Sequence, residues 1–341
     1  MRMMRKGTVT MPKKPIRALI TGGAGFIGSH LSEELLSRNF HVTVVDNLAT
    51  GISSNLGHVL RNKRFKFYKG SVFNKKLMSR LIKQCDIIYH FAAAVGVKYI
   101  LDHALECILT SIQGTNIVLQ LAAKYRKKVL IASSSEVSGK LHARLMKEED
   151  DRVLGPTTVN RWIYSEGKAL GEYLAFAYHK QFKLRMVIVR FFNILGPRQI
   201  SDYGMVLPRF IEEAMTGRPI TIMGNGSQVR SFTYVLDAVR AVADLSLTKE
   251  AEGRIFNIGN NQSQVTIKQL AHLVKRKTKS KSKIVYLSYD KYYGKQFEDV
   301  ARRVPDISRI KKVIGYRPRY GLAQIIDETL AYFRENNAKK A

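Results

Sequence analysis

The chain has 341 residues, 45% of them hydrophobic and 25% charged, which fits a globular protein of one large or two modest domains and excludes collagen-like repetition and wholesale disorder. No stretch approaches the roughly 18 consecutive apolar residues of a membrane span, and the basic tail 1–15 has no apolar core of a secretory signal. Two cysteines, Cys85 and Cys107, are too few for a disulfide framework or a zinc site, so we expect a cytoplasmic protein without a metal.

Charge is the unusual part of the composition, because 57 Lys and Arg against 27 Asp and Glu give a formal net charge of +30. Such an excess attracts polyanions and predicts weak, non-specific binding of nucleic acid at low salt. The densest basic run, residues 275–283, follows an amphipathic segment and precedes a strand-like one, so we interpret it as a solvated loop. No zinc-finger spacing or RNA-binding signature accompanies the charge, which disfavours a dedicated nucleic-acid function.

Strand-like apolar runs alternate with helical patterns through the first half of the chain. The expected strands are residues 17–21, 41–46, 65–70, 86–93, 128–135 and 185–193, and the expected helices include 29–38, 111–125 and 164–180. Strands that alternate with helices predict βαβ units and a parallel sheet, the α/β fold class. Beyond the last of these strands the regular alternation breaks.

A glycine-rich turn joins the first expected strand to the first expected helix. Gly22, Gly25 and Gly28 have the spacing G-x-x-G-x-x-G within TGGAGFIGSH. Glycines here let the backbone approach a pyrophosphate, and the following helix N-terminus offers free N–H groups to its charge. Asp46 ends the next strand, where a carboxylate can accept a hydrogen bond from the adenosine ribose 2′-OH and would repel a 2′-phosphate. The pattern predicts binding of NAD rather than NADP.

These signals define the expected organisation of the chain. We expect a Rossmann-type doubly wound parallel sheet as the NAD-binding domain in residues 16–185. A smaller C-terminal substrate-binding region, residues 186–341, is expected to be interleaved with it.

A second signal is the sequence YSEGK, which places Tyr164 and Lys168 one turn apart on one face of an expected helix. A tyrosine with a pKa of about 10 is a poor base near neutrality, and a nearby ammonium favours its phenolate. Ser134 ends an expected buried strand earlier in the chain. Beside a cofactor cradle, these three residues predict a Ser-Tyr-Lys oxidoreductase site.

From about residue 17 to residue 333, the chain resembles the NAD-dependent epimerase/dehydratase group of extended short-chain dehydrogenases/reductases. The motifs that carry the resemblance are TGGAGFIGSH, VVDNLATG, HFAAAVGV, SSSEVSG, YSEGK, RFFNILGPR, GNGSQVRSFTYVLDAV, FNIGN and RRVPDIS, in the family's order. Three departures concern pocket details rather than the reaction class. Ser138 replaces a usual tyrosine, Ser71 stands where an aspartate often contacts adenine, and Ser111 stands where an asparagine is common.

The resemblance implies roles for individual residues. Ser134, Tyr164 and Lys168 match the catalytic trio. The implied cofactor contacts are Gly22, Gly25, Phe26, Ile27, Gly28, Asp46, Asn47, Ala92, Tyr164 and Lys168. The implied substrate contacts are Ser135, Asn193 and Arg198 around the sugar, and Arg230 and Arg303 on the substrate diphosphate.

The resemblance also implies the first chemical step, in which a hydride moves from C4 of a nucleotide sugar to NAD while Tyr164 takes the hydroxyl proton. Ser134 would bond the substrate oxygen, and Lys168 would bind the nicotinamide ribose. The resulting 4-keto sugar can return as a C4 epimer, lose a carboxylate, or eliminate its C6 hydroxyl.

Glu136 bears on which outcome follows. Decarboxylases and dehydratases of the family carry a Glu there that can move a second proton, but dehydratases usually place an Asp before it, where this chain has Ser135. The stretches 154–168 and 297–308 resemble the bacterial UDP-glucuronate 4-epimerase branch. We therefore rank 4-epimerisation of a UDP-hexose or UDP-hexuronate such as UDP-glucuronate first, UDP-glucuronate decarboxylation to UDP-xylose second, and 4,6-dehydration third.

Other residues suit packing rather than chemistry. His90 lies in an apolar strand and is expected to be packed rather than catalytic, and Trp162 to pack beneath the site. A homodimer is expected, paired through the helix that carries Tyr164 and the helix before it. An alternative of a different class is a non-catalytic NAD- or RNA-binding protein, against which the intact Ser-Tyr-Lys set argues.

Overall fold

The computed structural model describes residues 14–93, 102–201, 205–289, 291 and 299–338. A seven-stranded sheet forms its centre, and every neighbouring pair of strands in it is parallel. In sheet order the strands are β11 Arg254–Ile258, β6 Met186–Phe191, β5 Lys128–Ser134, β4 Ile87–His90, β1 Arg17–Thr21, β2 His41–Asp46 and β3 Phe65–Lys69.

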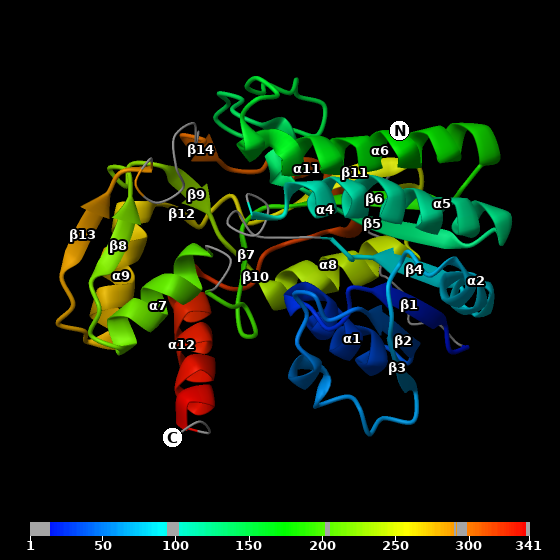
Figure 1. The fold of residues 1–341 in the computed structure, drawn as a ribbon, viewed down its shortest axis with the longest axis horizontal. Coiled ribbons are helices and arrows are strands. Elements are labelled where there is room, and N and C mark those ends of the chain that lie inside the picture. The colour runs from blue at the N-terminus through cyan, green and yellow to red at the C-terminus, as the bar shows by residue number, and fades with distance from the viewer. Residues whose placement is uncertain (1–13, 94–101, 202–204, 290, 292–298, 339–341) are drawn as a thin grey trace, which may run out of the picture.

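Helices cover both faces of this sheet, as Figure 1 shows. Helices α1 (Phe26–Ser37) and α8 (Val235–Leu247) pack on one face. Helices α2 (Lys75–Gln84), α5 (Thr115–Lys124) and α6 (Ile163–Phe182) pack on the other. Strands buried on both faces read as nearly continuous apolar runs, which is why the sequence revealed them. The arrangement confirms the predicted doubly wound α/β fold.

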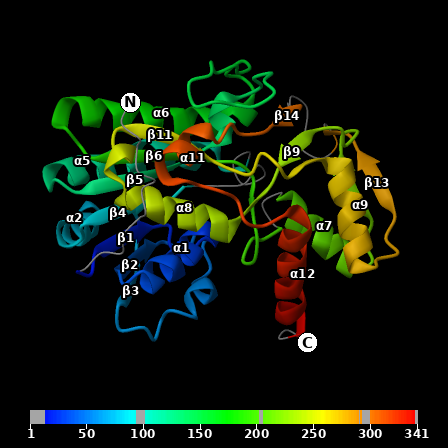
Figure 2. The ribbon, with the colours of Figure 1, turned by 180° about the vertical axis from the view of Figure 1, so that it is seen from behind.

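Later segments form a smaller part at one end of the sheet, seen from behind in Figure 2. Its helices are α7 Val206–Met215, α9 Ile267–Thr278 and α12 Leu322–Ala338, whereas α11 Ser308–Ile314 packs beside β11 and α8 of the main sheet. Among the described residues, the short strands of the smaller part form three small sheets. In one, β8 Ile220–Met223 pairs with β13 Ile284–Leu287, and in another, β7 Ile194–Leu195 pairs with β10 Thr233–Tyr234. The third has the order β12 Gln264–Thr266, β9 Val229–Ser231 and β14 Arg302–Arg303. No helix in the described part of the chain is both long and apolar enough to cross a bilayer.

Two sequence expectations need correction. The helix expected over 111–125 is interrupted: α4 (Ala104–Leu109) runs into a π-helical turn, Thr110–Gly114, before α5 begins. A π-helical turn adds one residue to the helical repeat, which hydrophobic periodicity does not register.

The basic run 275–283 is only partly a loop. Its first four residues form the last turn of α9, which ends at Thr278. Lys275, Arg276 and Lys277 there face the partial negative charge of the helix C-terminus, a favourable placement for cations. The helix can therefore extend through these basic residues, because its C-terminus stabilises their positive charge.

Candidate active site

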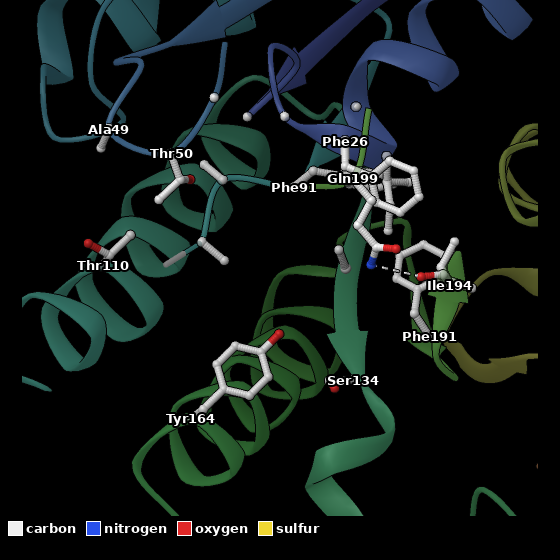
Figure 3. Close-up of a pocket in the computed structure, with 18 of the residues that line it drawn as sticks. Phe26, Ala49, Thr50, Phe91, Thr110, Ser134, Tyr164, Phe191, Ile194 and Gln199 are labelled. Carbon is white, nitrogen blue, oxygen red and sulfur yellow. Dashed lines mark hydrogen bonds between the residues drawn. The ribbon is translucent and has the colours of Figure 1, made fainter. Parts of the chain in front are cut away.

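The carboxyl ends of the central strands open onto one cavity of about 580 Å³ (Figure 3). Every residue that the sequence analysis assigned to catalysis, cofactor or substrate lines it except Arg230. The lining residues come from both halves of the chain, so a cofactor and a substrate bound in this cavity would contact both.

The glycine turn between β1 and α1 shapes one end of the cavity. Gly22 has a φ of +73°, and a Cβ there would lie 2.7 Å from the backbone nitrogen of Ala92. A Cβ on Gly28 would lie 2.4 Å from the carbonyl oxygen of Gly22. Gly25 precedes α1 without a side-chain cap, so the amides of the first helical turn remain open to a ligand anion. Only glycine fits this turn, and the turn fits the NAD pyrophosphate.

Asp46 stands beside the glycine turn at the end of β2. Its carboxylate accepts hydrogen bonds from the backbone amides of Ala24, at 2.9 Å, and Leu48, at 2.8 Å. Burial raises the pKa of Asp46, against the effect of these two amides. A carboxylate fixed at this edge of the cavity fits a partner for the adenosine ribose hydroxyls. Together with the glycine turn, it makes the residues present fit NAD.

The predicted catalytic trio comes together at the middle of the cavity. The Tyr164 hydroxyl projects into the cavity from α6, and Ser134 lies across from it at the end of β5 (Figure 3). Burial, with the charge of Glu136, raises the pKa of Tyr164, and a hydrogen bond with Ser134 opposes the rise. Before a cofactor binds, the tyrosine is therefore a neutral phenol.

Lys168 supplies an ammonium close to this phenol. Its Nζ donates to the carbonyl oxygen of Ala132 at 2.8 Å and lies 5.8 Å from the centre of the Tyr164 ring. Burial lowers the pKa of Lys168 to about 8, and Glu172 partly opposes this effect. The trio has the chemistry needed to remove a proton from an alcohol while a hydride leaves the same carbon.

Glu136 is locked between two arginines. Its Oε2 lies 2.6 Å from Nη2 of Arg161, and its Oε1 accepts from Nη1 of Arg303 at 2.6 Å. Burial favours the neutral acid, but the two guanidinium charges prevail and lower the pKa of Glu136 to about 2. In this arrangement Glu136 is an ionised carboxylate, so it would accept a proton before it could give one, and its movement of a second proton stays a prediction.

Sequence reasoning missed Arg161, although its position carried a signal. It precedes Tyr164 by three residues, so the turn that leads into α6 puts it on the side of the cavity. Both Arg161 and Arg303 are more than nine-tenths buried.

Arg303 and Arg230 do not act as an equivalent pair. Arg303 stands at Glu136, near Tyr164, and within the described residues its buried Nε and Nη2 have no hydrogen-bond partner. Arg230 is its neighbour on the paired strands β9 and β14, is held by Asp299 at 2.8 Å, and does not line the cavity. The two open donors of Arg303 suit an anionic group of a ligand at the reacting end of the cavity.

Arg198 lines the cavity from beside α1, and its contact with the sugar, implied by the resemblance, stays a prediction. Its guanidinium donates to Ser29 at 3.2 Å and to Glu33 at 2.6 Å, both on α1. Asn193 lines the same cavity and donates to the carbonyl oxygen of Ser231 at 2.9 Å. Next to Arg198, Gln199 donates to the carbonyl oxygen of Ile194, the bond drawn in Figure 3.

His90 and Trp162 occupy the packed positions predicted for them. His90 is buried between the hydroxyls of Thr21 and Thr115, and burial lowers its pKa to about 3. Trp162 is 3% exposed and packs in a cluster that includes Phe192. A neutral, enclosed imidazole and an enclosed indole support the site without entering it.

Of the three departures from the family pattern, Ser71 lines the cavity, whereas Ser111 and Ser138 are buried.

Comparison with known proteins identifies relatives along nearly the whole chain. A family model described as the NAD dependent epimerase/dehydratase family matches residues 18–259. The chain is 41% identical over 320 residues to UDP-N-acetyl-alpha-D-glucosaminuronate decarboxylase of Bacillus cytotoxicus, covering 94% of this chain and 98% of that protein. It is 34% identical over 322 residues to UDP-glucuronic acid decarboxylase 1 of Xenopus tropicalis, covering 94% of this chain and 72% of that protein.

A solved structure adds a relative with a different named activity. The structure of UDP-glucuronic acid 4-epimerase from Bacillus cereus in complex with NAD matches with a TM-score of 0.82 at 28% identity, covering 94% of this chain and 99% of that one. The similarity therefore extends to nucleotide-sugar decarboxylases and epimerases alike.

Proposed function

The chain belongs to the NAD-dependent epimerase/dehydratase family, and from this membership we propose that it oxidises C4 of a UDP-hexuronate and then releases the sugar carboxylate as CO₂. NAD is the family's cofactor and, when bound in the glycine cradle, supplies the hydride acceptor. This proposal ranks decarboxylation above the epimerisation that the sequence motifs favoured. The relatives and the charge cluster at Glu136 support the change.

In the proposed first step, Tyr164 is the base for the C4 hydroxyl. The Lys168 ammonium, 5.8 Å from the centre of the Tyr164 ring, favours the phenolate, and NAD, when bound, would supply further positive charge. The Ser134 hydroxyl donates to the same substrate oxygen and holds it in line with Tyr164. Lys168 also binds the nicotinamide ribose. The product is a 4-keto sugar with its carboxylate on C5.

The apposition of the Tyr164–Ser134 pair and the Glu136–Arg303 pair is the observation that carries the second step. C5 is bonded to C4, so a sugar whose C4 hydroxyl meets Tyr164 brings its acid group toward Arg303 and Glu136. The open donors of Arg303 can orient that carboxylate. The permanent charge of Glu136 repels it, which disfavours the ionised acid relative to neutral CO₂.

The bond changes in this step balance. The bond from C5 to the carboxyl carbon breaks, its electron pair passes into the C4 ketone to give an enolate, and CO₂ leaves. A proton taken up from solvent then adds to C5, and the hydride accepted in the first step returns to C4 to give a UDP-pentose. Tyr164, protonated in the first step, returns its proton to the C4 oxygen.

A panel of UDP-sugars tests the proposal. The purified protein, supplied with NAD, is incubated separately with UDP-glucuronate, UDP-N-acetylglucosaminuronate and UDP-glucose, and products are identified by NMR. We expect a UDP-pentose from at least one hexuronate and no conversion of UDP-glucose. Conversion of UDP-glucose to UDP-galactose would contradict the proposal.

A second candidate is 4-epimerisation of the same hexuronates. The similarity to the Bacillus cereus UDP-glucuronic acid 4-epimerase favours it, because its first step would need the same trio. The two reactions part only after C4 oxidation, so retention or loss of the carboxylate separates them. Dehydration is less favoured because Ser135 offers no carboxylic acid.

Residues after 185 supply β6, α8 and β11 to the main sheet and its cover as well as the smaller part, which we propose binds the substrate. We also propose a homodimer built on α6. Leu170, Tyr173 and Phe176 lie on one side of α6 and are 41%, 63% and 37% exposed, an apolar stripe on a catalytic helix. Light scattering of the wild type should give twice the chain mass, and Tyr173→Lys should give the monomer. A wild-type monomer would contradict the dimer.

A further inference from the structure

One turn beyond Lys168, a buried ion pair joins Glu172 of α6 to Arg190 of β6. We propose that Glu172 is a positioning residue, which holds α6 in register with β5 and keeps the ammonium of Lys168 charged for the reaction. The inference rests on the proposed function for the use of Lys168, but the contacts that carry it belong to a different set of side chains.

Both carboxylate oxygens of Glu172 accept hydrogen bonds. Its Oε1 accepts from the Ser133 hydroxyl at 2.5 Å and from Nε of Arg190 at 2.9 Å, and its Oε2 accepts from Nη2 of Arg190 at 2.7 Å. Arg190 also donates to the carbonyl oxygen of Glu148 at 3.1 Å. Glu172, Arg190 and Ser133 are 6%, 7% and 4% exposed. A pair buried this deeply has one defined geometry, since any other arrangement leaves a charge without its partners.

These bonds fix the register between helix and strand. Lys168 donates to the carbonyl oxygen of Ala132 at 2.8 Å, and Ser133 donates to Glu172. The next residue of the strand, Ser134, meets Tyr164. Three successive turns of α6 are thus bonded to three successive residues of β5, so the helix can neither slide nor rotate without breaking several bonds.

The charge of Glu172 acts on Lys168 through the same arrangement. Around the Lys168 ammonium, α6 contributes Tyr164 and Glu172, and β4 contributes the neutral His90. Glu172 is itself paired with Arg190 of β6. Burial lowers the pKa of Lys168 to about 8, and among these groups Glu172 is the anion that raises it. Without that anion the ammonium would lose its proton closer to neutrality, and the Tyr164 phenolate would lose its countercharge.

Direct titration of Lys168 tests the inference without any sugar substrate. In the NAD-loaded protein labelled with ¹³Cε-lysine, the Lys168 signal is assigned by its absence in Lys168→Arg and followed against pH. Glu172→Gln should lower its midpoint by about one pH unit. The matched control Ser133→Ala removes one bond to Glu172 but no charge, and should leave the midpoint where it is. An unchanged midpoint in Glu172→Gln would overturn the inference.

A double variant covers the case in which Glu172→Gln does not fold, because Arg190 would then be buried without an anion. Glu172→Gln with Arg190→Gln removes both charges and keeps a hydrogen-bonding pair. Its Lys168 midpoint should also fall, by less than in the single variant, since Arg190 opposes Glu172. A midpoint equal to that of the wild type would overturn the inference.

The rate of NADH formation with a UDP-hexuronate, measured by rapid mixing at a series of pH values, relates the charge of Lys168 to activity. The alkaline limb of its pH profile should move down in Glu172→Gln together with the Lys168 midpoint. A rate reduced equally at every pH would show a merely structural role and overturn the inference. If no sugar reduces NAD in the wild type, the proposed function fails, whereas the titration of Lys168 still decides the role of Glu172.

Discussion

At the scale of single residues, neighbours decide what each ionisable group can do. A protonated Glu136 could donate a proton, but the charges of Arg161 and Arg303 lower its pKa and keep it ionised. Tyr164 is a weak acid, and burial raises its pKa further. Positive charge placed beside it would lower that pKa again. The site therefore sets a fixed charge, Glu136, beside a variable one, Tyr164.

The first prediction concerns Tyr164. Tyr164→Phe removes only the ionisable oxygen, so NAD should bind as in the wild type while the rate of NAD reduction by substrate falls by on the order of 10²–10⁴. Stopped-flow absorbance of NADH and a binding titration with NAD measure the two effects. Undiminished NAD reduction in the variant would show that another group is the base.

The second prediction concerns stability in acid. The pKa of Glu136 is lowered from 4.5 in the unfolded reference to about 2 in the folded protein. A carboxyl group with a lowered pKa contributes stability that is complete above about pH 4.5 and is lost as the pH falls through about 2, here on the order of 3 kcal/mol. Urea unfolding at a series of pH values should therefore show a steeper acid loss in the wild type than in Glu136→Gln. Parallel curves would contradict the assigned ion pairs.

At the scale of elements, the strands were predictable and the helix irregularities were not. The sheet strands are apolar on both faces, so composition alone marks them. The π-helical turn Thr110–Gly114 depends instead on how closely α6 approaches it, which only the packed structure defines. Gly167 makes that approach possible, because a Cβ there would lie 2.9 Å from the Cβ of Ser111.

The third prediction follows from this contact. Alanine normally stabilises a helix interior relative to glycine, by about 1 kcal/mol. Gly167→Ala should instead destabilise the protein by about 1–3 kcal/mol, because the new methyl group overlaps Ser111.

Gly171 in the same helix provides the matched control. A Cβ there would meet Thr115 at 3.7 Å, an ordinary contact, so Gly171→Ala should be neutral or stabilising. Equilibrium unfolding in urea compares the two variants. A stabilised Gly167→Ala would mean that α6 does not lie this close to the π-helical turn.

At the scale of the whole molecule, the cavity joins residues that the sequence keeps far apart. The glycine turn, Asp46 and the trio could be predicted because each lies in a local motif next to a strand end. The ion pair of Glu136 with Arg303 spans 167 positions of the chain, and that of Arg230 with Asp299 spans 69. No local pattern specifies such pairs, which is why the contact of Arg303 with Glu136 was not predicted and Arg161 was missed.

The central claim is that this cavity oxidises C4 of a UDP-hexuronate and then expels its carboxylate. The most direct test supplies the NAD-loaded enzyme with UDP-glucuronate and UDP-N-acetylglucosaminuronate carrying ¹³C in the carboxyl group, and follows labelled CO₂ and the sugar product together by NMR. The account predicts one equivalent of ¹³CO₂ for each UDP-pentose formed from at least one of the two. Conversion to the C4 epimer with the label retained in the sugar would contradict it.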